Sequence, residues 1–119
     1  MVGVAVRRLV PGILVVGVLL GSCAGDPPEV PLGPDGQPDP VLADGRAVYA
    51  KHCAACHGRS GGGGQGPRLD GGAVVEAYPE FDDQVAVVAD GSGTMPSFVE
   101  RLTDRQIAAV TRYTREVLG

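Results

Sequence analysis

The residues best suited to chemistry lie in one short stretch, Cys53-Ala54-Ala55-Cys56-His57. The pattern C-x-x-C-H is the attachment signature of a c-type haem. The chemistry explains the residue types, because two thiols add to the haem vinyl groups while the adjacent imidazole ligates the iron. The sequence therefore predicts one covalently bound haem c, attached through Cys53 and Cys56, with His57 as an axial iron ligand.

A methionine in a polar, glycine-rich stretch is the candidate for the other axial position. Met95 precedes Pro96, and the other methionine of the chain is Met1. A thioether is a soft, uncharged ligand that favours Fe(II) and raises the reduction potential, and Pro96 keeps the stretch outside a helix. The alternative is that Met95 fills a gap in the core. The haem motif favours ligation.

The haem motif, the stretch around Met95 and an amphipathic C-terminal segment together resemble a small class I cytochrome c of the bacterial monohaem type. The resemblance covers residues 41–119. It implies an all-α cytochrome c fold, with three to four short helices wrapped around one covalently attached haem. It also implies that the carbonyl of Pro67 accepts from the ring N–H of His57, that Leu69 packs on the haem, and that Met95 is the distal ligand. An acceptor at Pro67 fixes the imidazole tautomer and raises its basicity.

Apolar spacing and capping signals predict where these helices lie. We expect a first helix over residues 43–56 and a short helix over residues 73–80. A third helix starts with Asp82 or Asp83 as its cap and runs to residue 89. The last helix covers residues 103–118 and begins with a capping box, Thr103-x-x-Gln106.

In the resembled family the first and last helices cross, with a small residue and an aromatic residue on one helix and an apolar and an aromatic residue on the other. Gly45 and Tyr49 match the first pair, and Val110 and Tyr113 match the second. A glycine at the crossing lets the two backbones touch. His52, which precedes the haem motif, is expected to be an exposed helix residue and not a ligand, because it points about 100° away from Cys53 around the helix.

The composition is compatible with a bound cofactor. The chain has three Tyr, two Phe and no Trp, and a domain of about 80 residues is marginally stable without help. A haem supplies the missing apolar core and stabilises only the folded state. The 14 acidic residues outnumber the 10 basic ones, which argues against a nucleic-acid partner.

The N-terminal 22 residues read as an export signal. Arg7 and Arg8 precede an apolar run, and the run ends in Leu20-Gly21-Ser22-Cys23, which resembles a bacterial lipobox. The resemblance implies cleavage before Cys23 and a lipid on its thiol. The alternatives are an uncleaved signal anchor, which is short for a membrane span, and a twin-arginine signal, which a haem attached after export does not need.

Residues 23–40 are interpreted as a lipidated cysteine followed by a Pro- and Gly-rich linker, and residues 41–119 as the cytochrome domain. The linker shows no helical or strand period, so we expect it to be disordered and extended. It serves as a tether or is merely a disordered terminus. The predicted location is the outer face of the bacterial cytoplasmic membrane, or the periplasm, with the protein held by its lipid.

The function that follows is single-electron transfer in a bacterial respiratory chain, without enzymatic activity. The partners that the family implies are a quinol–cytochrome c reductase and a terminal oxidase, with contact to the membrane through the lipid anchor. The alternative is a dedicated haem c subunit of a dehydrogenase or terminal reductase complex. A haem peroxidase or gas sensor needs an open iron position, which Met95 closes. A thiol–disulfide oxidoreductase needs a βαβ context, and structural zinc needs a fourth ligand.

Overall fold

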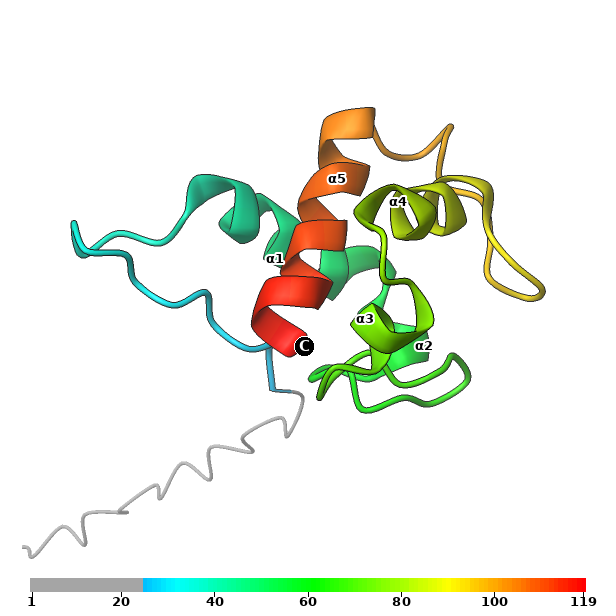
Figure 1. Ribbon diagram of the computed structural model, residues 1–119, viewed down its shortest axis with the longest axis horizontal. Helices are drawn as coiled ribbons and strands as arrows, with labels where there is room; N and C mark the ends of the chain where they lie inside the picture. The colour runs from blue at the N-terminus through cyan, green and yellow to red at the C-terminus, as the bar shows by residue number, and fades with distance from the viewer. Residues whose placement is uncertain (1–24) are drawn as a thin grey trace, which may run out of the picture.

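The computed structural model describes residues 25–119. Within them the named secondary-structure elements are all helices (Figure 1). The elements in chain order are α1 (Pro40–His52), α2 (Ala54–His57), α3 (Ala73–Ala77), α4 (Phe81–Asp90), α5 (Asp104–Tyr113) and a final π-helical turn, η1 (Thr114–Leu118). The prediction of an all-α chain is confirmed. The described part of the chain holds five α-helices instead of three or four, because the first predicted helix is divided at Cys53.

Helix α1 begins earlier than the sequence analysis expected. Asp39 is its N-cap, and one carboxylate oxygen accepts from the N–H groups of Val41 at 2.8 Å and Leu42 at 3.4 Å. Pro40 occupies the first helical turn, where its missing N–H costs nothing. The start predicted at residue 43 or 44 is therefore wrong, although Asp-Pro is itself a helix-start signal.

The crossing of α1 with α5 forms the centre of the core. A Cβ built on Gly45 would lie 2.2 Å from the carbonyl oxygen of Ala109 and 2.8 Å from the Cβ of Tyr113, so only glycine fits there. The rings of Tyr49 and Tyr113 lie 5.6 Å apart and are both fully buried. The predicted crossing is confirmed for these residues, while Val110 turns towards a cavity described below.

The helices after α2 follow their predicted positions with shifted ends. Helix α3 stops at Ala77, and α4 starts at Phe81, so that Asp82 and Asp83 lie in its first turn and do not cap it. Carboxylates in that turn interact favourably with the helix dipole. Helix α5 has the predicted capping box between Thr103 and Gln106, and the predicted last helix ends in the π-helical turn.

Residues 25–39, which we call the strap, arch outwards and return to the start of α1 (Figure 1), and their first part contacts α1 and α5. Val30 is 7% exposed and belongs to the main hydrophobic cluster. The Tyr113 hydroxyl donates to the carbonyl of Pro28 at 2.7 Å, and the Arg46 guanidinium donates to the same carbonyl at 3.0 Å. A disordered linker does not describe this segment. Prolines leave carbonyls free to accept, and the helices supply the donors.

The predicted signal peptide, residues 1–22, and the predicted lipidation site, Cys23, lie outside the described residues. Within residues 25–119, no helix combines the length and the apolar character that crossing a bilayer requires.

Candidate haem site

Two adjoining cavities lie between the helices and two loops. We call residues 58–72 the proximal loop and residues 91–98 the distal loop. The inner cavity has a volume of about 190 Å³, and its apolar lining is Leu69, Val74, Val87, Val88 and Val110. The outer cavity has a volume of about 220 Å³ and is lined in part by His52, Cys56, Gln65, Thr94, Pro96 and Phe98. Both cavities share Cys53, His57, Pro67, Ser92 and Met95.

The structure thus brings the predicted site residues of the described chain to one place. Cys53, His57, Pro67 and Met95 border both cavities, Cys56 borders the outer one and Leu69 the inner one. Cys53, α2 and the proximal loop are continuous in the chain, whereas the distal loop follows about 20 residues after the proximal loop, beyond α3 and α4.

The orientation of the His57 ring is fixed by a hydrogen bond. The side chain is buried, and its Nδ1 lies 2.9 Å from the carbonyl oxygen of Pro67. A carbonyl only accepts, so Nδ1 carries the hydrogen and Nε2 keeps a free lone pair. The contact that the family resemblance implied for Pro67 is present, and it leaves Nε2 as the nitrogen available to a metal.

Gly66 places the proximal loop against the same ring. A Cβ at this residue would lie 2.8 to 3.1 Å from three ring atoms of His57. Backbone bonds hold the approach, from Gly66 N–H to the Cys56 carbonyl at 2.8 Å and from Gly63 N–H to the His57 carbonyl at 2.7 Å. Sequence reasoning did not single out Gly66, although a glycine directly before the proline that accepts from a ligand was a usable signal.

The two cysteines of the motif differ in exposure. Cys53 is half-buried and Cys56 is exposed. Burial raises the pKa of the Cys53 thiol to about 11, and the neighbouring Cys56 adds to the effect. The Cys53 thiol is therefore neutral at pH 7, and both sulfurs lie along the wall of the outer cavity.

Met95 is presented by a short turn. The N–H of Ser92 donates to the Met95 carbonyl at 3.1 Å, and the N–H of Met95 donates to the Ser92 carbonyl at 2.9 Å. Further along, Ser97 Oγ donates to the carbonyl of Ala89 at 2.7 Å, and Phe98 is 4% exposed. The Met95 side chain is partly buried against the hydrophobic cluster.

His52 differs from its expected position. It is partly buried instead of exposed, and its ring meets Phe98 edge to face with centroids 6.1 Å apart. It borders the outer cavity but not the inner one. The reason is that Phe98 in the distal loop folds back over the end of α1, which the helical angle alone does not show.

Sequence reasoning also missed a buried polar pair in the inner cavity. Gln84 is 4% exposed and Thr114 is 5% exposed, and Gln84 Nε2 donates to Thr114 Oγ1 at 2.8 Å. Gln84 lies in α4 between Asp83 and Val85, and no pattern in the sequence signals its burial. Buried polar groups of this kind are retained only when they are hydrogen-bonded.

The donor set fits a haem iron better than the alternatives. An imidazole lone pair, a thioether and two thiols border apolar cavities, which suits a large apolar macrocycle with a soft iron centre. In residues 25–119 no three His, Cys, Asp or Glu side chains are grouped to hold a metal ion. The structural-zinc interpretation therefore has no ligand set in this part of the chain.

Comparisons with known proteins agree with this geometry. The family described as "Cytochrome C oxidase, cbb3-type, subunit III" matches residues 40–113, from the start of α1 to the end of α5. The chain is also 38% identical over 79 residues to cytochrome c6 of Leptolyngbya boryana, a match that covers 60% of this chain and 86% of the relative. The chain belongs to the cytochrome c family.

Other similarities extend this cytochrome assignment. Cytochrome c6 of Cladophora glomerata is 34% identical over 85 residues, covering 61% of this chain and 85% of the relative. The crystal structure of cytochrome c6 from the diatom Phaeodactylum tricornutum superposes with a TM-score of 0.54 at 28% identity, over 61% of this chain and 88% of that one. The all-α cytochrome c fold is confirmed. The protein is a monohaem electron carrier with one covalent haem c and acts with redox partners, and it is not an enzyme.

Proposed function

We propose that this cytochrome is an exported single-electron carrier of a bacterial respiratory chain, with its iron held between His57 and Met95. Cys53 and Cys56 provide the thioether bonds. The observation that carries the proposal is the convergence of these four residues on the outer cavity, with His57 Nε2 left as the free nitrogen of a hydrogen-bonded ring.

The chain's own residues create the conditions that electron transfer needs. A bound haem supplies the one-electron chemistry. Pro67 keeps the His57 ring in one orientation, so the ligand does not have to turn when the charge changes. The lining of the inner cavity is mainly apolar and offers water few partners, a setting that favours the reduced state.

The outer cavity supports an exit route for the electron. Cys56 is exposed at its edge, and the uncharged residues Gln65, Thr94 and Pro96 border it. A partner that docks on these three residues does not have to remove water from a charged group. We propose a quinol–cytochrome c reductase as donor and a terminal oxidase as acceptor.

Replacement of Met95 tests the axial ligation. Met95→Ala should open one iron position, lower the reduction potential and let CO or cyanide bind quickly. The wild type should show the weak near-infrared absorption of Fe(III)–thioether bonding, and the variant should lack it. His52→Ala is the matched control, because His52 borders the outer cavity only, and it should keep the wild-type spectrum. Loss of the band in His52→Ala with retention in Met95→Ala would contradict the proposed ligand pair.

Replacement of the thiols tests the attachment. Cys53→Ser or Cys56→Ser should leave at most one thioether bond, and the double variant should leave none. Mass spectrometry of protein coexpressed with haem-attachment machinery measures this directly. A wild-type protein that keeps an apo mass and two free thiols under those conditions would contradict covalent attachment.

We also propose that a lipid on Cys23 anchors the protein at the outer face of the cytoplasmic membrane, after removal of residues 1–22. Two or more acyl chains anchor a protein stably. Cys23→Ser should abolish incorporation of a tagged palmitate, as measured by metabolic labelling and mass analysis of the mature N-terminus. An unmodified Cys23 with residues 1–22 still attached would indicate a plain signal anchor.

A second candidate role is that of a dedicated haem c subunit in a larger complex. The matching family is described as a subunit of a cytochrome c oxidase. A structure described as the dihydro-heme d1 dehydrogenase NirN also superposes, with a TM-score of 0.53 at 28% identity over 16% of that chain. Purification in gentle detergent separates the two roles, because a dedicated subunit remains with stoichiometric partners whereas a mobile carrier is recovered alone.

A further inference from the structure

The inner cavity has a polar section that haem attachment and axial ligation do not use. Tyr78, Gln84 and Thr114 line it beside the valines. Gln84 and Thr114 are almost fully buried and bonded to each other at 2.8 Å, and Thr114 Oγ1 donates to the carbonyl of Thr111 at 2.9 Å. These hydrogen bonds therefore fix the orientation of the Gln84 and Thr114 side chains.

A guanidinium lies directly behind this section of the wall. Arg115 donates to the side-chain oxygen of Gln84 at 3.2 Å, to the carbonyl of Tyr78 at 2.7 Å and to the carbonyl of Pro79 at 2.8 Å. Two of these three acceptors belong to residues that border the inner cavity. Arg115 does not line the cavity itself but hydrogen-bonds two residues that do, Gln84 through its side chain and Tyr78 through its carbonyl.

In the described part of the chain, Arg115 forms no ion pair with a carboxylate. Within residues 25–119 the arginines that form ion pairs are Arg46, Arg68, Arg105 and Arg112, whereas the acceptors of Arg115 are neutral oxygens. The side chain is partly buried. A charge in such a position is screened by solvent and salt much less than an exposed one.

The two hydrogen bonds of the Gln84 amide orient its dipole so that it adds to the positive potential of Arg115. Gln84 turns its oxygen to Arg115 and its amide nitrogen to Thr114, so the positive end of the amide dipole lies on the side away from the guanidinium. Both the cation and the dipole therefore favour the state of the cavity that holds one more electron.

We propose that Arg115, held in place by Gln84, is a positioning residue that raises the reduction potential of the haem site. The inference rests on the electron-carrier function and deepens it. It does not depend on which partner donates the electron. Arg115 touches neither the haem ligands nor the attachment thiols, so its influence is electrostatic and acts through the wall of the inner cavity.

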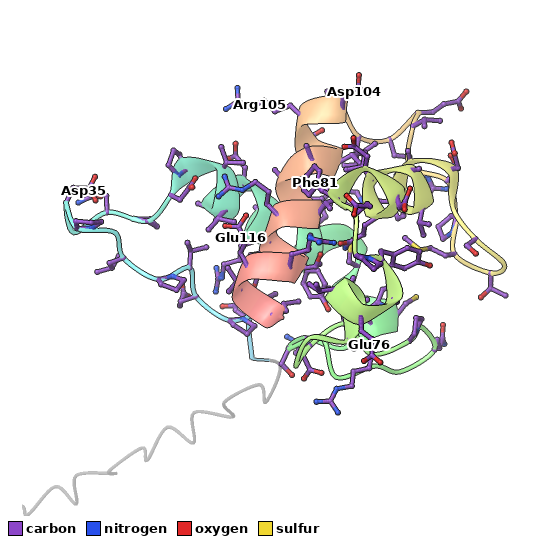
Figure 2. All side chains as sticks on the ribbon, in the orientation of Figure 1. Asp35, Glu76, Phe81, Asp104, Arg105 and Glu116 are labelled. Atoms are coloured by element: carbon purple, nitrogen blue, oxygen red, sulfur yellow. The ribbon has the colours of Figure 1, made fainter. Side chains whose placement is uncertain are left out.

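Spectroelectrochemical titration of the full holoprotein tests the proposal. Arg115→Gln and Arg115→Met both remove the charge, and Arg115→Lys keeps it while losing the planar fork. Arg105→Gln is the control, because Arg105 lies in the first turn of α5, its side chain is 80% exposed and it reaches outwards (Figure 2). Each variant is titrated at low salt and at about 1 M salt, where the Debye length is about 3 Å.

We expect both neutral variants to have a lower midpoint potential than the wild type at both salt concentrations, with unchanged visible spectra. Arg115→Lys should stay closer to the wild type than either neutral variant, and Arg105→Gln should not shift at high salt. Equal shifts in Arg115→Lys and the neutral variants, or no shift in any, would overturn the proposal. Failure of both neutral variants to retain haem would do so too, because Arg115 would then be a structural brace. A wild type without the proposed ligand spectrum would instead refute the His57–Met95 ligation.

Discussion

The proximal and distal loops face the same cavities but are fixed to different degrees. The proximal loop meets the His57 ring through Gly66, accepts its N–H at Pro67, and is tied back to α2 by two backbone bonds. The distal loop holds Met95 by one pair of backbone bonds with Ser92. The position of His57 is therefore built into the fold, whereas the position of Met95 depends on a short turn and on apolar packing.

The difference indicates a division of labour between the two ligands. A ligand fixed by several independent contacts keeps the haem plane in one place during both redox states. Displacing a ligand that is held by a turn costs less free energy, because fewer contacts of the protein have to break. We expect perturbations of the proximal side and of its supports to affect folding of the holoprotein, and perturbations of the distal side to affect ligand exchange.

The largest effect is expected from Gly66→Ala. The new Cβ would lie 2.8 Å from a ring atom of His57, which forces the ring or the loop to move, and overpacking of this kind costs about 1 to 3 kcal/mol. We expect strongly reduced haem incorporation and an altered low-spin spectrum in the protein that does mature. Gly62→Ala is the control in the same loop, because its Cβ would meet only the Asp70 carboxylate at 3.9 Å. If both variants incorporate haem equally well and have the same spectrum, the proximal loop can move to accommodate the new Cβ at low cost.

The next effect is on global stability rather than on haem incorporation. It concerns the strap, which contacts α1, α5 and Arg59 of the proximal loop. Removal of residues 25–38 exposes the core around Val30 and takes the Pro28 acceptor away from Tyr113. We expect a loss of about 3 kcal/mol in the free energy of unfolding, from one buried valine and one orphaned hydroxyl. Denaturant titration of both redox states measures the loss.

A pair of point variants separates strap packing from chain length. Val30→Ala should be destabilised, because the side chain is 7% exposed, while Leu32→Ala should not, because its side chain is 68% exposed. If the two variants and the truncated chain are all as stable as the wild type, the strap is not part of the cytochrome domain. In that case a domain that starts at Val41 folds by itself, as the sequence alone suggested.

On the distal side we expect a smaller and more local effect from Ser97→Ala. The change removes the bond from Ser97 Oγ to the Ala89 carbonyl, which is worth about 1 kcal/mol. Added imidazole should then displace Met95 about fivefold faster, without a matching change in global stability. Ser60→Ala, at an exposed position of the proximal loop, is the control and should leave the displacement rate unchanged. Stopped-flow loss of the near-infrared band measures the rate.

The smallest effect is expected for the cap of α1, the helix that leads into the haem motif. The N–H of Val41 and then the Arg112 guanidinium hold the pKa of Asp39 below its ordinary value of 3.8. Because the folded-state pKa is depressed, the stabilisation is present above about pH 4 and is lost as the pH falls through the lower, folded-state pKa. Asp39→Asn keeps a capping oxygen but does not titrate. Its thermal stability should fall less steeply than that of the wild type below about pH 4, and an identical slope would contradict this role.

The sequence allowed much of this structure to be predicted where the signals were local. The haem motif, the capping box at Thr103 and the crossing glycine at Gly45 each depend on a short pattern with one physical meaning. The contact between Pro67 and His57 was implied by the family resemblance and is present. These features need no knowledge of distant partners.

The features that could not be predicted depend on partners far away in the chain. The strap was interpreted as disordered from its prolines, yet the donors to its carbonyls lie on Arg46 and Tyr113. The buried Gln84 is satisfied by Thr114 in another helix. A pattern within one segment cannot show a donor supplied by another, so neither the ordered strap nor the buried glutamine follows from the sequence.

The position of the first strap residues has a consequence for how the protein meets its partners. The carbonyl of Gly25 accepts from Arg59, which lies two residues after the haem motif. A lipid on Cys23 would then join the membrane to the folded domain over only the residues around Ala24. So short a connection would let the domain rotate above its anchor and would keep its haem-attachment helix close to the lipid headgroups. Electron delivery would then depend on lateral diffusion of the whole protein in the plane of the membrane, and its partners should present their redox centres at low height above the bilayer.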